Sequence, residues 1–279
     1  MKILWVSDHT LKSRPAGGAE LTDFYMIQEG IRRGHEIHNV TPPTSELFDP
    51  NDYDFVVLSN NAEYQHSTRL KFLQLPYVVY CHDCLGWKAV YREVPNLFEK
   101  SLANIFLSPL HLKFFGSVPN AFCVPPHIPE RFKDLKLKRI PNSVLYVGNI
   151  WDGPKGANNL WEYINSHPEQ TFYFCYHRAI ETWVKKFSEL PNVKMLGHIP
   201  HERMPEVFNK YEYFIHLPNN KIEAFGRAVA EAYLCGCKMI VNDYVGAFSY
   251  RWSLYYDYFR EKTLNSPKEF WETIEESLK

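Results

Sequence analysis

Short apolar runs alternate with amphipathic segments along most of the chain. In the first half, continuous apolar runs that end in polar or turn residues indicate buried parallel strands. They cover residues 2–7, 35–42, 53–60, 76–83, 103–108 and 121–126. Between the first two runs, residues 21–34 carry apolar side chains at helical spacing and end at Gly34. The pattern predicts a β–loop–α–β unit followed by four further strands.

The alternation restarts after residues 128–142, a charged segment with two prolines and no core pattern. Two successive series of βα units predict an α/β protein with two doubly wound parallel sheets. We place the domains at residues 1–130 and 143–279, the second with a terminal helix, and the linker at 131–142. In the second domain, strands are expected at 143–150, 171–176, 192–199, 213–218 and 238–243, and helices at 155–166, 179–190, 202–211, 224–236 and 267–278.

The composition is that of an ordinary globular protein. Of 279 residues, 45% are hydrophobic and 23% are charged, which allows two domains with sizeable cores. The formal net charge of −1 gives no bulk attraction to nucleic acid or to an anionic membrane. No apolar run is long enough to span a membrane, and the first residues resemble a strand more than a signal peptide. We therefore expect a cytoplasmic protein, with peripheral membrane association left open.

Four of the six cysteines lie in two short motifs, CHDC (81–84) and CGC (235–237). A zinc site is conceivable there, but structural zinc sites usually combine two C-x₂-C hooks. Most of the cysteines adjoin apolar strands. We therefore interpret them as buried, reduced thiols and expect no metal at these positions.

The most informative stretch is NKIEAFGRAVAEAYLCGCKMIVND, residues 220–243. A loop after a strand leads into a helix that is expected to start near Ala224 or Phe225. The first amides of this helix, at Phe225, Gly226 and Arg227, would have no helical partner. They would form an anion site that the helix dipole reinforces.

Two carboxylates flank this anion site. Glu223, at its edge, would repel a bare phosphate but would accept hydrogen bonds from sugar hydroxyls. Glu231 lies about two turns further on and would accept from a second polyol such as a ribose. The order fits sugar, diphosphate and ribose, as in a nucleotide sugar. The plain alternative is an ordinary amphipathic helix with Glu223 near its N-cap and Glu231 solvated, and spacing alone does not decide between them.

Residues 222–243 resemble the E-x₇-E donor-binding segment of the retaining glycosyltransferases of family 4, which have the GT-B fold. Other segments resemble further motifs in the family's order, from residue 1 to about residue 245. They are AGGAE (16–20), VVYCHD (78–83), CVPPHIPERF (123–132), LYVGNIWDGPKG (145–156) and VKMLGHIPHERMPEVFNKYEYFIHLP (193–218). The resemblance implies two Rossmann-like domains facing across a cleft, the first for the acceptor and the second for the nucleotide sugar.

The resemblance also assigns roles to single residues. Glu223 would hold donor-sugar hydroxyls, Glu231 the ribose, and Lys155 would neutralise the diphosphate. His82 would lie near the donor sugar and the reacting centre. The remaining donor-binding positions are Gly17 and Gly18 facing the diphosphate, the amides of Phe225, Gly226 and Arg227 around the sugar and diphosphate, and Gly197 and His198 under the base.

Two departures from the family pattern stand out. Asn149 occupies a position where the family usually has an arginine, so Arg178 or Arg227 would have to supply the missing positive charge. The glycine run after the last motif is reduced to YVGAFSY (244–250). The remaining chain appears short for a long helical return to the first domain.

The expected chemistry needs neither a metal nor another cofactor. We identified no Asp-x-Asp pair suited to Mg²⁺ or Mn²⁺. Lys155 and a helix N-terminus would stabilise the departing diphosphate instead. The family typically retains anomeric configuration by front-side attack, with the leaving phosphate accepting the acceptor's proton, and we therefore assign no protein general base.

The sequence predicts a hexosyltransferase-like enzyme that moves a sugar from a nucleotide diphosphate to an acceptor hydroxyl. The acceptor class stays open between a glycan, a lipid-linked sugar, a protein and a modified nucleic acid. One alternative is a transferase acting on modified DNA bases, which the near-zero net charge disfavours. A second is a catalytically weak nucleotide-sugar-binding protein, for which Asn149 is the main support.

Overall fold

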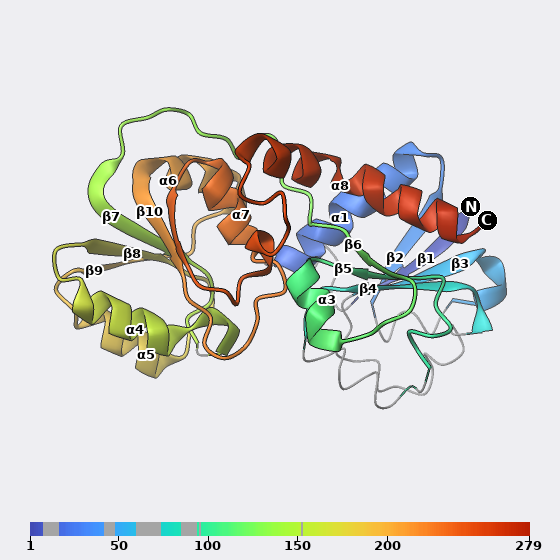
Figure 1. The fold of residues 1–279 in the computed structure, drawn as a ribbon, viewed down its shortest axis with the longest axis horizontal. Coiled ribbons are helices and arrows are strands. Elements are labelled where there is room, and N and C mark those ends of the chain that lie inside the picture. The colour runs from blue at the N-terminus through green and yellow to red at the C-terminus, as the bar shows by residue number, and fades with distance from the viewer. Residues whose placement is uncertain (8–16, 42–47, 60–73, 85–93, 95, 152) are drawn as a thin grey trace. The chain divides into compact units, whose positions relative to one another are not determined.

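The computed structural model describes residues 1–7, 17–41, 48–59, 74–84, 94, 96–151 and 153–279. The chain divides into two compact units. The first comprises Met1–His127 together with Glu261–Lys279, and the second comprises Ile128–Arg260. Each unit contains one parallel sheet, so the predicted fold class is confirmed (Figure 1).

The first sheet contains all six predicted strands of this half in the order β2-β1-β3-β4-β5-β6. They are β1 (Lys2–Val6), β2 (Glu36–Val40), β3 (Phe55–Ser59), β4 (Tyr77–Cys81), β5 (Ala103–Phe106) and β6 (Ala121–Cys123), with α1 (Gly18–Arg32), η2 (Pro50–Asp52) and α3 (Pro109–Phe115). Helix α3 was not predicted. Ser108 caps it by accepting from the His111 amide, and Pro109 occupies a first-turn position, where a missing N–H costs nothing.

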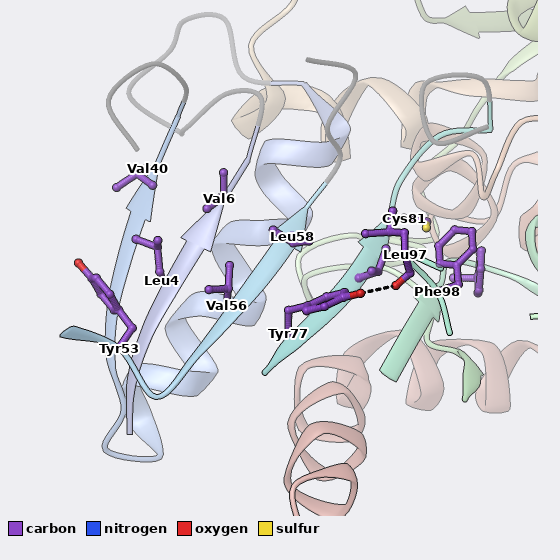
Figure 2. Packing of buried hydrophobic residues seen from close by; sticks show 12 residues of the cluster. Leu4, Val6, Val40, Tyr53, Val56, Leu58, Tyr77, Cys81, Leu97 and Phe98 are labelled. Carbon is purple, nitrogen blue, oxygen red and sulfur yellow. Dashed lines mark hydrogen bonds between the residues drawn. The ribbon is translucent and has the colours of Figure 1, made fainter. Parts of the chain in front are cut away.

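The first sheet buries side chains on both faces, as its continuous apolar strands require. Leu4 and Val6 share one face with residues from β3 and β4 in the cluster drawn in Figure 2. Between them, Trp5 points to the opposite face and packs against Phe270 at a ring-centroid distance of 5.6 Å. In Figure 2 the Tyr77 hydroxyl donates to the carbonyl of Leu97 at 2.6 Å, which satisfies the one polar group of this buried ring.

The second sheet has the order β11-β10-β7-β8-β9, again parallel throughout. Its strands are β7 (Ile140–Val147), β8 (Thr171–Cys175), β9 (Val193–Gly197), β10 (Tyr211–His216) and β11 (Lys238–Val241). Its helices are α4 (Ala157–Ser166), α5 (Glu181–Ser188), α6 (Met204–Lys210) and α7 (Arg227–Leu234), with short turns η4 (Gly153–Lys155), η5 (His201–Arg203) and η6 (Gly246–Phe248). Figure 1 shows α4 and α5 on one face of this sheet and α6 and α7 on the other. Strand β7 begins inside the predicted linker, because Ile140 pairs with Tyr211 of β10.

The last helix, α8 (Tyr256–Ser277), corrects the predicted domain division. We assigned the terminal helix to the second domain and saw little room for a return to the first, but residues from Glu261 onward belong to the first unit. Trp271 explains this: its side chain is fully buried, and its indole N–H donates to the carbonyl of Met26 on α1 at 2.7 Å. The guanidinium of Arg33 pairs with Glu275 at 2.9 Å on the same side of the unit.

The start of the terminal helix was also predicted wrongly. Ser266 and Pro267 suggested an N-cap and a first helical residue, but Pro267 lies inside α8. Proline cannot donate the helical hydrogen bond to the carbonyl four residues earlier, which is that of Thr263. The Ser266 hydroxyl donates to that carbonyl at 3.1 Å, so the helix continues through the proline.

Within the described residues, no helix is both long enough and apolar enough to cross a membrane. None of the six cysteines forms a disulfide, and burial raises the pKa of five of their thiols, which lie at positions 81, 123, 175, 235 and 237.

Candidate functional site

A cluster of charged side chains gathers where strands of the second sheet end. The ammonium of Lys155, on η4 after β7, lies 2.5 Å from Oε2 of Glu223. Nε2 of His216, the last residue of β10, lies 3.2 Å from the same oxygen. Ligands of open α/β folds bind at the carboxyl ends of the strands, where this cluster stands. We call these three residues the Lys155–Glu223–His216 cluster.

The backbone fixes both ends of the ion pair. Glu223 makes an isolated parallel bridge: its N–H donates to the carbonyl of Tyr244 at 2.8 Å, and its carbonyl accepts from Gly246 at 3.0 Å. Behind Lys155, Gly156 adopts φ +66°. A Cβ on Gly156 would lie 1.7 Å from the carbonyl oxygen of Leu217, so only glycine lets η4 approach the end of β10 this closely.

The electrostatics of the cluster favour an ionised Glu223. Burial alone would raise its pKa, but Lys155 and His216 outweigh burial and lower the pKa to about 2. Burial lowers the pKa of His216, although Glu223 opposes this effect. A neutral His216 donates its Nε2 proton to Glu223, because a carboxylate can only accept. Its Nδ1 is buried and has no hydrogen-bond partner within the described part of the chain.

Helix α7 begins later than predicted, at Arg227. Gly226 is its N-cap with φ +86°, a left-handed conformation that excludes Phe225 from the helix. The Ala230 amide donates to the carbonyl of Gly226 at 3.1 Å, which closes the first turn of the helix. The amides of the first helical turn, which precede the helical bonding pattern, are therefore two positions further along than expected, at Arg227, Ala228 and Val229.

Phe225 and Gly226 still shape the entrance to α7. The Phe225 side chain is buried and stacks with Phe259 at 6.5 Å, so only its backbone is available to a ligand. A Cβ on Gly226 would come within 3.3 Å of the Cγ of Glu223. The missing side chain thus leaves the stem of Glu223 close against the helix start.

Glu231 is 4% exposed, so the alternative in which it is simply solvated is wrong. Its Oε1 lies 2.9 Å from Nε2 of His201 and 3.2 Å from Nε of Arg227. The other ring nitrogen of His201 faces the guanidinium of Arg131 at 3.1 Å. This arrangement orients a buried carboxylate from both sides, and it also engages Arg227, one of the two candidates to replace the missing family arginine.

The other candidate, Arg178, lies next to Asn149, the residue that departs from the family pattern. Oδ1 of Asn149 accepts the backbone N–H of Arg178 at 3.1 Å, and Arg178 is exposed. On the neighbouring strand, Gly197 ends β9 with φ +69°, and the exposed ring of His198 lies 5.1 Å from that of His177. The loops after β7, β8 and β9 therefore carry the residues predicted for the diphosphate and base side by side.

A second cluster lies in the first unit and is formed by three buried residues. His82, directly after β4, has Nε2 at 3.1 Å from Oδ1 of Asp23 on α1. The Ser59 hydroxyl at the end of β3 donates to the same carboxylate at 2.6 Å. The ring of Tyr80 packs against His82 at 4.3 Å. We call this the Asp23–Ser59–His82 cluster. It holds the ring of the predicted catalytic histidine in place, with Nε2 directed toward Asp23.

Gly17 and Gly18 occupy the N-terminal end of α1, where Gly17 is the N-cap and both are exposed. A Cβ on Gly17 would approach the Glu20 carboxylate to 2.7 Å. Residues 8–16, which precede them in the sequence, lie outside the described residues. His127, which had no predicted role, tethers α8 instead: its Nδ1 lies 3.1 Å from the carbonyl of Leu264.

An Asp-x-Asp pair does occur in the chain, as Asp52 and Asp54, but it precedes β3. It therefore stands at the amino end of the sheet, opposite to the ligand-binding end. Oδ2 of Asp54 accepts the backbone N–H of Lys2 at 2.7 Å, a structural role at the strand edge. Within the described ranges, no group of three His, Cys, Asp or Glu side chains is placed to hold a metal.

Four residues that contact the predicted site residues were missed in the sequence: His216, His201, Asp23 and Ser59. Two of them have a local signal. His216 is a polar residue at the end of an apolar strand, and Asp23 lies among the apolar positions of an amphipathic helix. A buried polar residue needs a hydrogen-bond partner, but which residue serves as that partner depends on the tertiary structure.

Comparison with known proteins bears on the family and the fold. Residues 128–251, nearly the whole second unit, match the family model "Glycosyl transferases group 1". No curated protein sequence matches the chain significantly.

Solved structures match over almost the full length at low identity. AviGT4, a glycosyltransferase involved in avilamycin A biosynthesis, has a TM-score of 0.68 at 12% identity, covering 99% of this chain and 98% of its own. Anabaena HepE, solved with UDP and glucose, has a TM-score of 0.63 at 14% identity, covering 97% and 94%. The lipopolysaccharide outer core galactosyltransferase WaaB has a TM-score of 0.60 at 12% identity, covering 99% of both chains.

The fold is GT-B, and residues 128–251 of the second unit match the group 1 glycosyltransferase model. The resemblance seen in the sequence is confirmed at the level of this group, and membership of family 4 stays a prediction. Domain and fold together support a glycosyltransferase.

Proposed function

We propose that this protein transfers a sugar from a nucleotide diphosphate to an acceptor hydroxyl. The observation that carries the proposal is the Lys155–Glu223–His216 cluster. It combines a cation for a diphosphate with an ionised, half-buried carboxylate for sugar hydroxyls, next to the start of α7. Glu231, oriented by His201 and Arg227 further along the same helix, supplies the acceptor for ribose hydroxyls.

In the proposed reaction the bond between the sugar's anomeric carbon and the diphosphate oxygen breaks. A bond from that carbon to the acceptor oxygen forms, and the acceptor's proton passes to the leaving diphosphate. Lys155 and the amides at the start of α7 stabilise the negative charge that develops on the leaving group. His82, held by Asp23, is assigned to the reacting centre by the resemblance. Transfer with retention and without a metal is part of the proposal.

The second diphosphate cation is assigned to Arg178. Its backbone is held by Asn149, the residue that stands where the family has an arginine, and Arg227 is already engaged by Glu231. The base is assigned to the edge formed by Gly197 and His198. The Anabaena relative was solved with UDP, which makes uridine the first nucleoside to test. The acceptor class remains one of the four named above, and peripheral membrane association is part of the proposal only for a lipid-linked acceptor.

The test is nucleoside diphosphate release from a panel of UDP-, GDP-, ADP- and TDP-sugars, without acceptor. Wild type, Glu223→Ala and a charge-matched control, Glu212→Gln, are compared; Glu212 pairs with Lys238 at the far end of β10. Release from one donor that is lost in Glu223→Ala and kept in Glu212→Gln supports the transferase. Repeating the assay with EDTA and with Mg²⁺ tests the metal-free proposal.

Two results would count against the proposal. Donor binding without any release, even with a mixed acceptor panel, would favour the alternative of a nucleotide-sugar-binding protein. If no donor raised the melting temperature, the assignment of the cluster to a nucleotide sugar would fail. Turnover only with modified DNA as acceptor would not count against sugar transfer, but it would select the DNA-base alternative.

A further inference from the structure

The ion pair between Lys155 and Glu223 joins the two residues that a donor would need separately. Their charged atoms lie 2.5 Å apart, and their side chains are only 25% and 18% exposed. In such a half-buried pair, solvent screens the attraction far less than at the surface. A ligand that binds the ammonium must therefore compete with a carboxylate that is already in place.

His216 keeps Glu223 in this position independently of Lys155. It donates to the same carboxylate oxygen at 3.2 Å from a strand end that is itself buried. The Glu223 backbone is bridged on both sides to residues 244–246. The contacts of Glu223 thus hold its carboxylate in place, whereas Lys155 has a flexible stem that can turn toward another anion.

Resting on the proposed function, we infer that Glu223 is an internal counter-ion of Lys155 that makes the site prefer a nucleotide sugar to a free nucleoside diphosphate. A free diphosphate must displace Glu223 from Lys155 and leaves the carboxylate without hydroxyl donors. A nucleotide sugar offers hydroxyl groups to Glu223 while its diphosphate takes the ammonium. Donor binding is thereby favoured over product binding, and product release is assisted.

Binding of inorganic pyrophosphate, measured by titration calorimetry, tests this inference. Pyrophosphate carries the two phosphates but no hydroxyls for Glu223. Removing the carboxylate in Glu223→Gln should tighten pyrophosphate binding by about three- to tenfold. Lys155→Met should weaken it, and Glu212→Gln, which changes the net charge equally at a remote pair, should leave it unchanged.

The double variant separates an internal counter-ion from simple repulsion. If Glu223 acts by holding Lys155, adding Glu223→Gln to Lys155→Met gives no further gain, because no ammonium is left to release. A gain of the same size in both backgrounds would mean that Glu223 only repels the anion, and the inference would be wrong. Unchanged or undetectable pyrophosphate binding in folded Glu223→Gln would also overturn it.

These outcomes do not depend on turnover. A protein that hydrolyses a donor but binds pyrophosphate equally well in wild type and Glu223→Gln would refute the inference and leave the proposed function standing. Tighter pyrophosphate binding in Glu223→Gln, with no donor turnover by wild type even with the mixed acceptor panel, would leave the counter-ion role of Glu223 standing and refute the proposed function. Thermal melts show whether each variant is folded. Comparing pyrophosphate binding by Lys155→Met and by the double variant gives a second test that does not rely on the Glu223→Gln single variant alone.

Discussion

The side chains of both clusters are held by partners that are distant in sequence. Lys155 and Glu223 are 68 residues apart, and His82 and Asp23 are 59 apart. In each cluster a carboxylate, buried for Asp23 and half-buried for Glu223, meets a histidine Nε2, so the ring orientation follows from the carboxylate. A histidine that donates through Nε2 leaves Nδ1 as its acceptor atom.

Asp23 should matter to activity through His82. In Asp23→Asn the carboxamide no longer fixes which ring nitrogen carries the proton, and donor turnover should fall by about 10- to 100-fold with a smaller change in KM. Ser59→Ala, which removes the other donor to Asp23, is the matched control and should have a smaller effect. The key measurement repeats Asp23→Asn in a His82→Ala background: an undiminished loss there would show that Asp23 acts independently of His82.

The pKa of Glu223 predicts an acid-dependent stability. Its folded pKa, about 2, lies below the ordinary 4.5, so its stabilising contribution is complete above pH 4.5 and is lost as pH falls toward 2. The difference in unfolding free energy between wild type and Glu223→Gln should therefore shrink over this range. Urea denaturation at pH 7, 4 and 3 measures it. A difference that stays constant with pH would contradict the assigned pairing.

At the scale of elements, short glycine-dependent contacts bring the cluster together. The η4 turn and the end of β10 approach so closely that Gly156 has no room for a Cβ. The start of α7 depends in the same way on the left-handed Gly226. Both glycines lie beside charged residues of the site, so backbone geometry and binding chemistry are coupled there.

Gly156→Ala should destabilise the protein by clearly more than the ~1–3 kcal/mol of a strained backbone alone, because the Cβ collides with the Leu217 carbonyl. Gly34→Ala is the matched control: its φ is also positive, at +88°, but no atom lies within 4 Å of the added Cβ. Chemical denaturation compares the two. Gly156→Ala should also weaken pyrophosphate binding, because Lys155 is its neighbour, whereas equal effects of both variants would contradict this account.

The positions of nearly all strands and most helices were predictable, because buried parallel strands and amphipathic helices have strong hydrophobic patterns. The failures have local causes. Helix α3 is only seven residues long, too short for a clear period. At α7, the conformation of one glycine moved the start to Arg227. Lys155, Glu223 and Glu231 were singled out from the sequence, but His216, His201, Asp23 and Ser59 were not, because the sequence does not show which groups on different elements meet.

At the scale of the whole molecule, the chain returns to its first unit after completing the second. The last part of α8 packs against that unit through Phe270 and Trp271, both fully buried. Gly30 of α1 has no side chain where the Trp271 ring lies, since a Cβ there would be 2.3 Å from it. The first unit is therefore complete only when the two ends of the chain are both present.

Trp271→Ala should lower the stability of the first unit by about 3–5 kcal/mol, the usual cost of removing a buried aromatic ring. Hydrogen exchange with mass spectrometry can locate the effect. Peptides from residues 1–127 and 261–279 should lose protection, and those from 128–260 should keep most of theirs. Tyr258→Ala, at an exposed ring on the same helix, is the control. Equal loss of protection in both units would show that they unfold together.

The sequence by itself determined the fold class, the order of the strands along the chain and the charged residues of the donor segment, since these follow from local periodicity and from motifs that are contiguous in the chain. Only the tertiary structure decided that Lys155 is paired with Glu223, that histidines orient both Glu223 and Glu231, and that α8 completes the first unit. Those outcomes depend on which distant groups meet and on how burial changes their charges. These contacts form only when the helices and strands pack against one another.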